Sequence, residues 1–248
     1  MLLTIDVGNT QTVFGLFAGD ELAEQRRIAT EAQRTGDELS VLLRGLLGGV
    51  ELSGICLSST VPSLVREYEA LAERWPARIL VVGPGVRTGI QLRYDDPREL
   101  GPDRIANSVA ARERHGAPCI VVDFGTSTNF DVVSPDGDYV GGVLAPGIEV
   151  SMDALFARAA RLVKVDFVEP PTTIAKNTVA ALQSGLVHGF AGQVDRIVEE
   201  IRRELRADAP AIATGGLAPL IAPHARTIVQ VDAALTLHGL RLIWERNL

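Results

Sequence analysis

The hydrophobic positions of this 248-residue chain form short apolar runs that alternate with longer amphipathic stretches. An apolar run predicts a strand over residues 1–6, and alternation on both sides of Gly19-Asp20 predicts a β-hairpin. Leucines recur on one helical face of the next segment. The later segments of this half are a helix, a strand, a helix and a strand at 36–47, 54–60, 62–75 and 77–85. The first half therefore reads β-β-β-α-β-α-β.

The same pattern restarts at residue 118. A strand at 119–125 is followed by a hairpin over 129–144 that turns at Asp136-Gly137. The remaining patterns predict a helix at 148–162, a long amphipathic helix at 176–206, a strand at 210–216, a short helix and a last helix at 234–248. Because the restart is an internal repeat, two α/β lobes are expected, 1–116 and 117–248, with a hinge near 116.

Two of the predicted strands end in an Asp-x-Gly turn. Asp6 and Gly8 follow the first strand, and Asp123 and Gly125 follow the strand that opens the repeat. A carboxylate at the edge of a sheet can hold hydrated Mg²⁺, and the glycine lets the backbone turn sharply and present N–H groups to phosphate. One such turn usually means only a turn, but two copies favour phosphate binding by two facing lobes.

Composition excludes some classes of partner. The formal net charge of −7 disfavours a nucleic-acid or membrane-surface partner, because neither polyanion would attract the chain. No apolar run approaches the roughly 18 residues of a membrane span, and the first strand starts without a charged leader, so a cytoplasmic location is expected. Cys56 and Cys119 lie in apolar runs that predict buried, reduced thiols. The four histidines show no metal-ligand spacing, and three aspartates are expected to be solvated or capping, namely Asp153, Asp166 and Asp195.

Other segments admit two interpretations each. Residues 84–104 form a long loop without periodicity, and loops of this length are usually functional or disordered. Tyr94, Asp103 and the arginines of this loop favour the functional interpretation. At its end, Asp103 and Arg104 offer an acid and an anion-binding fork, or simply the ordinary charges of a helix start. The pair Gly215-Gly216 allows close approach of adenine or is a plain strand-to-helix turn. The segment GGVLAPG is typical of a hairpin followed by a helix start, and it is of interest because it is close to the second Asp-x-Gly turn. Its glycines and proline are Gly141, Gly142, Pro146 and Gly147.

Five motifs in register carry a family resemblance. They read DVGNT, TGIQLRYDDPRELGPDR, DFGTSTNFDVV, KNTVAALQSG and ATGGLAP. In this order they resemble type III pantothenate kinases over nearly the whole chain. The resemblance implies two duplicated ribonuclease-H-like lobes of the actin-like ATPase and sugar kinase superfamily. It also implies ATP-dependent phosphorylation of pantothenate to 4'-phosphopantothenate, the first step of coenzyme A biosynthesis, with Mg²⁺ and a monovalent cation, K⁺ or NH₄⁺. A homodimer with the helix 176–206 at or near its interface is implied as well.

The resemblance also assigns roles to single residues. The first phosphate loop comprises Asp6, Val7, Gly8, Asn9, Thr10, Gln11, Thr12 and Val13, with Asp6 facing the metal-bound phosphates. Asp123 resembles the monovalent-cation ligand, and Thr126 resembles an ATP contact. The segment that resembles the pantothenate site consists of Tyr94, Gly101, Pro102, Asp103 and Arg104. Within it Asp103 takes the place of the general base, and Thr178 matches a further pantothenate contact.

The chain departs from the family pattern in two places. The second phosphate loop usually reads D-F-G-T-A-T-T, whereas this chain has Ser127 and Asn129, and Ala175 replaces the glycine before K-N-T. Asn129 can still donate a hydrogen bond, and Ala175 is costly only if its φ is positive.

Two further functions stay open. One is a different small-molecule kinase of the superfamily, because a fold does not fix the acceptor. The other is a catalytically silent nucleotide-binding regulator. Against the regulator stand the three aspartates Asp6, Asp103 and Asp123 together, since phosphate binding alone needs no general base.

Overall fold

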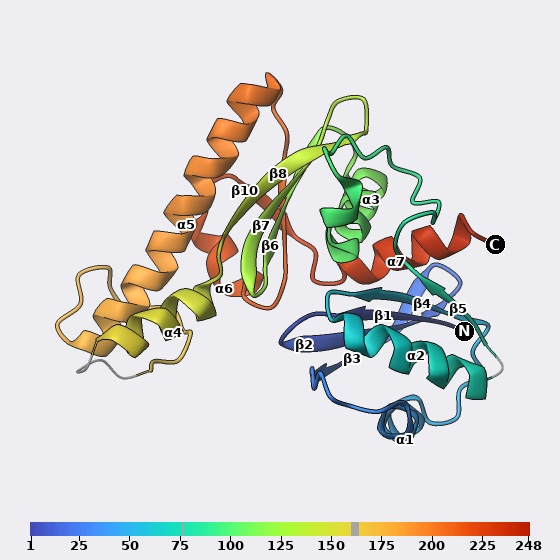
Figure 1. Ribbon diagram of the computed structural model, residues 1–248. Helices are drawn as coiled ribbons and strands as arrows, with labels where there is room; N and C mark the ends of the chain where they lie inside the picture. The colour runs from blue at the N-terminus through green and yellow to red at the C-terminus, as the bar shows by residue number, and fades with distance from the viewer. Residues whose placement is uncertain (76, 160–163) are drawn as a thin grey trace. The chain divides into compact units, whose positions relative to one another are not determined.

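The computed structural model describes residues 1–248 except 76 and 160–163 (Figure 1). The chain forms two compact units, one of Met1–Ala110 with Leu235–Leu248 and one of Ala111–Ala234. The predicted lobes, 1–116 and 117–248, differ from these units mainly in one element. The last helix was predicted in the second lobe, but it packs in the first unit.

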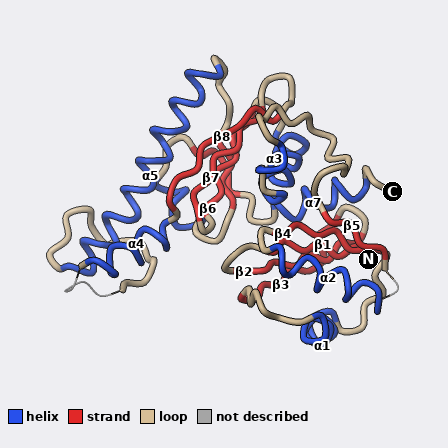
Figure 2. The backbone as a smooth tube through the Cα atoms, in the orientation of Figure 1, coloured by secondary structure: helices blue, strands red, loops and turns tan. Residues whose placement is uncertain are grey.

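The first unit is a five-stranded mixed sheet with helices, in strand order β3-β2-β1-β4-β5 (Figure 2). Its strands are β1 (Leu2–Val7), β2 (Gln11–Ala18), β3 (Glu21–Ala29), β4 (Gly54–Ser59) and β5 (Arg78–Val81). Its helical segments are α1 (Gly36–Leu47), α2 (Pro62–Arg74), η1 (Pro97–Glu99), the first part of α3 (Pro102–His115), and α7 (Leu235–Glu245). The predicted order β-β-β-α-β-α-β is confirmed, although β5 is shorter than predicted.

Helices cover both faces of this sheet. Alternate residues of β1, from Leu3 to Val7, share one core with the buried leucines of α1 and α2. On the other face lies α7, where a Cβ added to Gly15 would come within 3.0 Å of Leu237. A Cβ on Gly54 would overlap the Trp244 ring. Since no side chain fits between β4 and this ring, the last helix belongs to the first unit by close packing.

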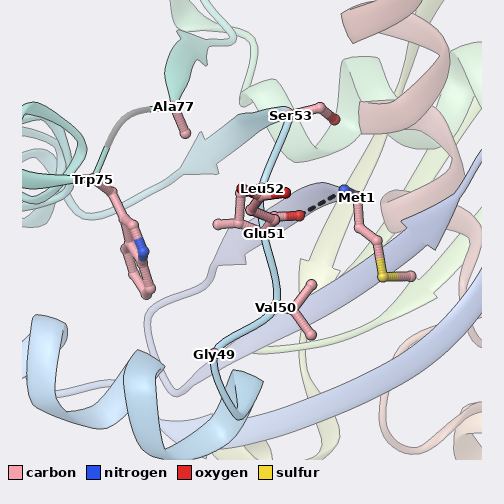
Figure 3. A pocket seen from close by; sticks show the side chains of 8 residues that line it. All are labelled: Met1, Gly49, Val50, Glu51, Leu52, Ser53, Trp75 and Ala77. Atoms are coloured by element: carbon pink, nitrogen blue, oxygen red, sulfur yellow. Dashed lines mark hydrogen bonds between the residues drawn. The ribbon is translucent and has the colours of Figure 1, made fainter.

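A pocket of about 580 Å³ opens at the amino end of the parallel strands β1, β4 and β5 (Figure 3). Its lining residues are Met1, Gly49, Val50, Glu51, Leu52, Ser53, Trp75 and Ala77. The amino group of Met1 donates to the carbonyl oxygen of Glu51 at 2.8 Å. Ligands of open α/β sheets bind outside the carboxyl ends of the strands. This pocket lies at the other end of the sheet, because Met1 precedes β1 whereas Asp6 is near the carboxyl end of that strand.

The second unit repeats the sheet of the first. Its strands are β6 (Cys119–Phe124), β7 (Ser127–Val133), β8 (Tyr139–Pro146), β9 (Ala211–Thr214) and β10 (Ile228–Val231), in the order β10-β9-β6-β7-β8. Each pairing has the same sense as its counterpart in the first unit: β6 with β7 and β7 with β8 are antiparallel, and β6 with β9 and β9 with β10 are parallel. The predicted duplication is confirmed strand by strand.

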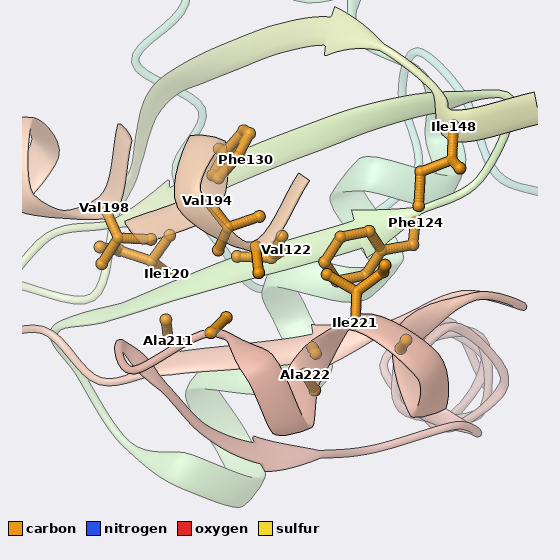
Figure 4. Close-up of a cluster of buried hydrophobic side chains, with 14 of the residues drawn as sticks. Ile120, Val122, Phe124, Phe130, Ile148, Val194, Val198, Ala211, Ile221 and Ala222 are labelled. Carbon is orange, nitrogen blue, oxygen red and sulfur yellow. The ribbon is translucent and has the colours of Figure 1, made fainter. Parts of the chain in front are cut away.

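The helices of the second unit pack over one face of its sheet (Figure 4). They are α4 (Ile148–Arg158), α5 (Thr178–Leu205), α6 (Ala218–Ile221) and η2 (Ala222–His224). Val194 and Val198 of α5 meet Ile120 and Val122 of β6 in the core. Residues 160–162, where the predicted helix 148–162 ends, lie outside the described residues.

Three of the simpler expectations have mixed outcomes. Cys56 and Cys119 are buried free thiols, as predicted. Asp153 is exposed, also as predicted, and the structure adds an ion pair between its carboxylate and Lys164. Asp195 is the exception, because it is only 6% exposed and accepts hydrogen bonds from the backbone N–H and hydroxyl of Thr227. Asp195 is a buried structural carboxylate that fastens α5 to the segment before β10.

Candidate functional site

The first Asp-x-Gly turn joins β1 to β2. The N–H of Gly8 donates to the carbonyl oxygen of Gln11 at 3.0 Å, which closes the turn. Thr30 supports it from β3's end, because its N–H donates to Thr10 O at 3.0 Å and its hydroxyl lies 2.8 Å from that of Thr12. Asn9 and Thr10 remain exposed at the tip. All eight residues predicted for this loop thus lie on one continuous β-turn-β segment.

Asp6 is the carboxylate of this turn. It lies half-buried near the carboxyl end of β1, opposite Val13 of β2 and Ser58 of β4. The Ser58 hydroxyl donates to Asp6 Oδ1 at 2.9 Å. Thr60 holds the end of the strand through two hydrogen bonds to Val7 O, one from its N–H and one from its hydroxyl. The Asp6 carboxylate is therefore fixed in direction on a rigid strand.

The second turn repeats this arrangement after β6. Asp123 occupies the same position in β6 as Asp6 in β1, opposite Asn129 of β7 and Thr214 of β9. The N–H of Gly125 donates to Ser127 O at 3.0 Å, and Thr126 is exposed at the tip.

Two glycines are needed for the packing of the second turn. A Cβ on Gly147 would overlap the carbonyl oxygen of Thr126, and a Cβ on Gly215 would reach Asp123 Oδ1 and overlap Phe124 O. Gly215 also has φ +90°, a conformation that favours glycine. The interpretation of Gly147 as part of a helix start is confirmed, because it is the N-cap of α4. The missing side chain of Gly215 makes room for Asp123 and its strand.

The two departures from the family pattern are accommodated locally. The Ser127 hydroxyl donates to Asn129 Oδ1 at 2.7 Å, so the two unusual residues bond to each other. Among the described residues other than glycine, only Arg206 has a positive φ. Ala175 therefore bears no backbone strain.

Asp103 lies in the first turn of α3, which begins at Pro102 as predicted. Asp103 Oδ1 is buried and accepts no hydrogen bond within the described part of the chain. Burial raises the pKa of this carboxyl, while nearby backbone N–H groups and the Arg104 guanidinium lower it by smaller amounts. Gly101 leaves the room that Oδ1 occupies, since a Cβ there would overlap this oxygen. The chain thus keeps a desolvated acceptor at a helix start.

The other predicted substrate residues belong to different elements. Tyr94 is half-buried in the loop between β5 and η1, and Arg104 is 6% exposed on α3. Thr178 is exposed at the first position of α5, where Asn177 caps the helix by accepting from the N–H of Ala180 at 2.9 Å. The first unit therefore contains Asp6, Tyr94, Asp103 and Arg104, and the second contains Asp123, Thr126 and Thr178.

Sequence reasoning missed the residues that hold the site in place. Ser58 and Thr30 are ordinary hydroxyl residues in the sequence. The contact of Ser58 with Asp6 could have been predicted, because the carboxyl ends of the neighbouring parallel strands β1 and β4 lie at one edge of the sheet. The contact of Thr30 with the first turn had no comparable signal.

The described residues hold no group of three or more His, Cys, Asp or Glu arranged to bind a metal. Mg²⁺ needs no such group when one carboxylate, water and nucleotide phosphates hold it. The fixed, half-buried Asp6 carboxylate fits that mode of binding. A search for membrane spans found none among the described helices.

Comparisons with known proteins agree with this geometry. The family model described as type III pantothenate kinase matches residues 2–200. The chain is 56% identical over 253 residues to a type III pantothenate kinase of Acidothermus cellulolyticus, covering 100% of this chain and 99% of that protein. A solved Campylobacter jejuni structure, named for the Baf family of transcriptional activators, matches with TM-score 0.64 and 19% identity over 99% of this chain and 98% of that one. The ROK hexokinase of Thermus thermophilus matches with TM-score 0.53 and 14% identity, over 98% and 97%. The two structures show the shared actin-like fold, with its duplicated ribonuclease-H-like lobes.

Proposed function

This chain belongs to the type III pantothenate kinase family, whose members use ATP to phosphorylate pantothenate at the start of coenzyme A biosynthesis, and from that premise we propose roles for its residues. Asp103 is the general base for the pantothenate hydroxyl. Asp6 faces the Mg²⁺-bound phosphates, and Asp123 binds a monovalent cation.

The buried Oδ1 of Asp103 carries the assignment of the base. A desolvated carboxylate oxygen without a hydrogen-bond donor gains one when an alcohol binds beside it. In phosphoryl transfer the incoming hydroxyl must lie in line with the γ-phosphate, so a carboxylate that accepts its proton both orients and activates it. The raised pKa of Asp103 makes it a better proton acceptor than an exposed aspartate.

Asp6 and its turn suit the phosphates of ATP. Ser58 occupies one carboxylate oxygen of Asp6 through a hydrogen bond, which fixes the direction of the other. When bound, Mg²⁺ neutralises phosphate charge, and Asp6 would hold it through its water shell. The exposed residues of this turn, Asn9, Thr10 and Gln11, present backbone N–H groups and polar side chains to the phosphoryl oxygens.

Asp123 has a different environment from Asp6. Its neighbour across the antiparallel pair is the amide Asn129, where Asp6 has the apolar Val13. Two carboxylates facing polyphosphate would repel it unless each were compensated. We therefore assign K⁺ or NH₄⁺ to Asp123 and an ATP contact to the neighbouring Thr126.

The pantothenate segment consists of Tyr94, Gly101, Pro102 and Arg104 around Asp103, with Thr178 as a further contact. Arg104 is nearly buried beside the base, where its fork can bind a carboxylate or a phosphoryl oxygen. Because Thr178 is exposed at the start of α5, its hydroxyl is available to a ligand.

We propose a homodimer with α5 at or near the interface. Two large apolar side chains on either side of the start of this helix are exposed, Ile174 by 86% and Val179 by 42%. Exposed apolar residues that form one patch mark protein–protein interfaces.

The test of the base is Asp103→Asn, which keeps the size of the side chain but removes the basic oxygen. Turnover should fall by roughly 10²–10⁴ while ATP affinity stays near that of the wild type. The matched control is Asp95→Asn, an exposed aspartate of the loop between β5 and η1, which should retain turnover. If Asp103→Asn kept more than about a tenth of wild-type turnover, Asp103 would be a positioning residue and the base would lie elsewhere.

A further inference from the structure

The loop that carries Tyr94 is braced by the last residues of the sequence. Asn247 follows α7, and its side-chain amide bonds to both backbone groups of Arg87. The N–H of Arg87 donates to Asn247 Oδ1 at 3.1 Å, and Asn247 Nδ2 donates to Arg87 O at 2.9 Å. This paired contact resembles one rung of a β-ladder, with the amide of Asn247 in the place of a peptide group.

Asn247 is itself held from two sides. Its Nδ2 also donates to Ile243 O at 2.8 Å, inside α7. Its own carbonyl oxygen accepts from Arg78 Nη2 at 2.7 Å, and the Arg78 guanidinium lies 5.4 Å from the Trp244 ring centroid. A cation over an aromatic face adds further attraction. The amide therefore projects from a fixed point on the packed helix.

A second contact follows two residues along the loop. Gly89 has φ +78°, and a Cβ there would overlap the Arg246 side chain. The loop thus passes directly over Arg246 and Asn247 before Ile90, which is only 6% exposed, buries itself in the unit. Beyond Ile90 the chain reaches Tyr94.

This loop depends on such contacts for its order. Between β5 and α3, where every residue is described, the one helix is the three-residue η1, and no strand is longer than one residue. A segment without backbone hydrogen bonds of its own is held in place by its contacts with neighbouring elements. Ordering such a segment costs conformational entropy, which these contacts must offset.

We propose that Asn247 is a positioning residue for pantothenate, acting by holding the Arg87–Tyr94 segment in its binding conformation. This inference rests on the proposed pantothenate contact of Tyr94. It adds to the determinants of substrate affinity a residue that is far from Tyr94 in the sequence.

The variant Asn247→Ala removes both bonds to Arg87. Its KM for pantothenate should rise by roughly three- to tenfold, whereas KM for ATP and the turnover at saturation should change little. Asn247→Asp keeps the acceptor for the Arg87 N–H but turns a carboxylate oxygen toward two carbonyl oxygens, so its effect on pantothenate KM should be larger. Leu248→Ala is the matched control, since Leu248 is 80% exposed, and it should behave as the wild type.

Hydrogen exchange without substrates tests the brace apart from the reaction. Amides of residues 84–95 should exchange faster in Asn247→Ala than in the wild type, while amides of β1 and β4 stay protected. Unchanged exchange in this segment would overturn the inference. So would faster exchange with an unchanged pantothenate KM, or an equal rise of both KM values. A Tyr94→Ala variant with normal pantothenate KM would instead count against the proposed substrate contact itself.

Discussion

Asp6 and Asp123 are the clearest case of equivalent residues with different neighbours. Both stand fifth in the first strand of their sheet, and both lie between an antiparallel and a parallel strand. Asp6 meets Val13 and Ser58, and Asp123 meets Asn129 and Thr214. The two carboxylates thus have equivalent places in the two sheets but different neighbouring side chains.

The raised pKa of Asp103 makes a prediction for stability. In the unfolded chain this carboxyl has the ordinary pKa of about 3.9. Because burial raises the folded value, the folded state binds more protons between the two pKa values, and stability falls as pH rises through that window. Asp103→Asn should therefore raise the melting temperature at neutral pH, with the gain vanishing below about pH 3.9.

Thermal melts of wild type, Asp103→Asn and the exposed control Asp95→Asn across this pH range measure the effect. A gain that persisted unchanged at low pH would contradict an origin in the buried charge.

The raised pKa of Asp103 also makes a prediction for activity. As pH falls, kcat/KM should begin to drop at a pH above the pKa of an ordinary aspartate.

The cation assignment makes its own prediction. The wild type should turn over faster in K⁺ or NH₄⁺ than in Na⁺ alone, and Asp123→Ala should lose this response. Asp153→Ala serves as control, because its carboxylate is exposed and pairs with Lys164 far along the chain from the turn. Equal rates and equal ATP affinity in Na⁺ and K⁺ for the wild type would refute the role.

The sequence predicted the residues that bear the proposed chemistry better than those that support them. Asp6, Asp123 and Asp103 stand at strand ends or a helix start, where glycine or proline marks the place. Ser58 and Asn247 act through contacts with residues 52 and 160 positions away. Nothing local in the sequence encodes such a contact, because it exists only after the strands and the last helix are packed.

Among the helices and strands, the start of α4 shows how packing constrains a loop. Gly147 is the N-cap of α4, and its φ of −71° suits any residue. What requires glycine there is space, since the carbonyl oxygen of Thr126 occupies the position of a Cβ. The second Asp-x-Gly turn is therefore shaped by a residue some twenty positions later in the chain.

Gly147→Ala tests this packing. The added methyl group should push the turn at Thr126 aside, at a cost of about 1–3 kcal/mol in the free energy of unfolding, and raise KM for ATP. Gly185→Ala is the control, because a Cβ at this exposed position of α5 would meet open space and alanine favours the helix. Chemical unfolding and steady-state kinetics of both variants decide the matter; equal stability of the two would contradict the overlap.

Hydrophobic periodicity predicted the order of these elements well and their ends less well. The run 77–85 reads as one strand, but β5 covers only Arg78–Val81, because pairing with β4 stops at Leu57. The N–H of Val82 still donates to Leu57 O at 2.8 Å, and the pairing with β4 ends there. Sheet pairing, which the sequence pattern does not contain, sets such boundaries.

For the molecule as a whole, the family match decides among the functions that the sequence left open. The type III pantothenate kinase of Acidothermus cellulolyticus matches the full chain at 56% identity. This match favours pantothenate phosphorylation over a kinase with a different acceptor and over a catalytically silent regulator. The match to a protein named for transcriptional activators, at 19% identity, shows the fold alone.

The homodimer is the prediction that concerns the whole assembly. Light scattering at micromolar concentration should give twice the 26.5 kDa of one chain. Val179→Glu should weaken the association by placing a charge on the proposed interface, whereas Val41→Glu, 75% exposed on α1, should not. A fully active wild-type monomer would rule out the dimer.

The place of α7 in the first unit has a consequence for synthesis on the ribosome. Chains emerge from the amino end, and domains generally fold as they appear. The second unit is continuous, Ala111–Ala234, and can close as soon as it has emerged. The first unit is made earlier, yet its sheet lacks one covering helix until Leu235–Leu248 arrives, and the face that receives Leu237 and Trp244 stays open in the meantime. The half of the protein that is translated first is thus the half that is completed last.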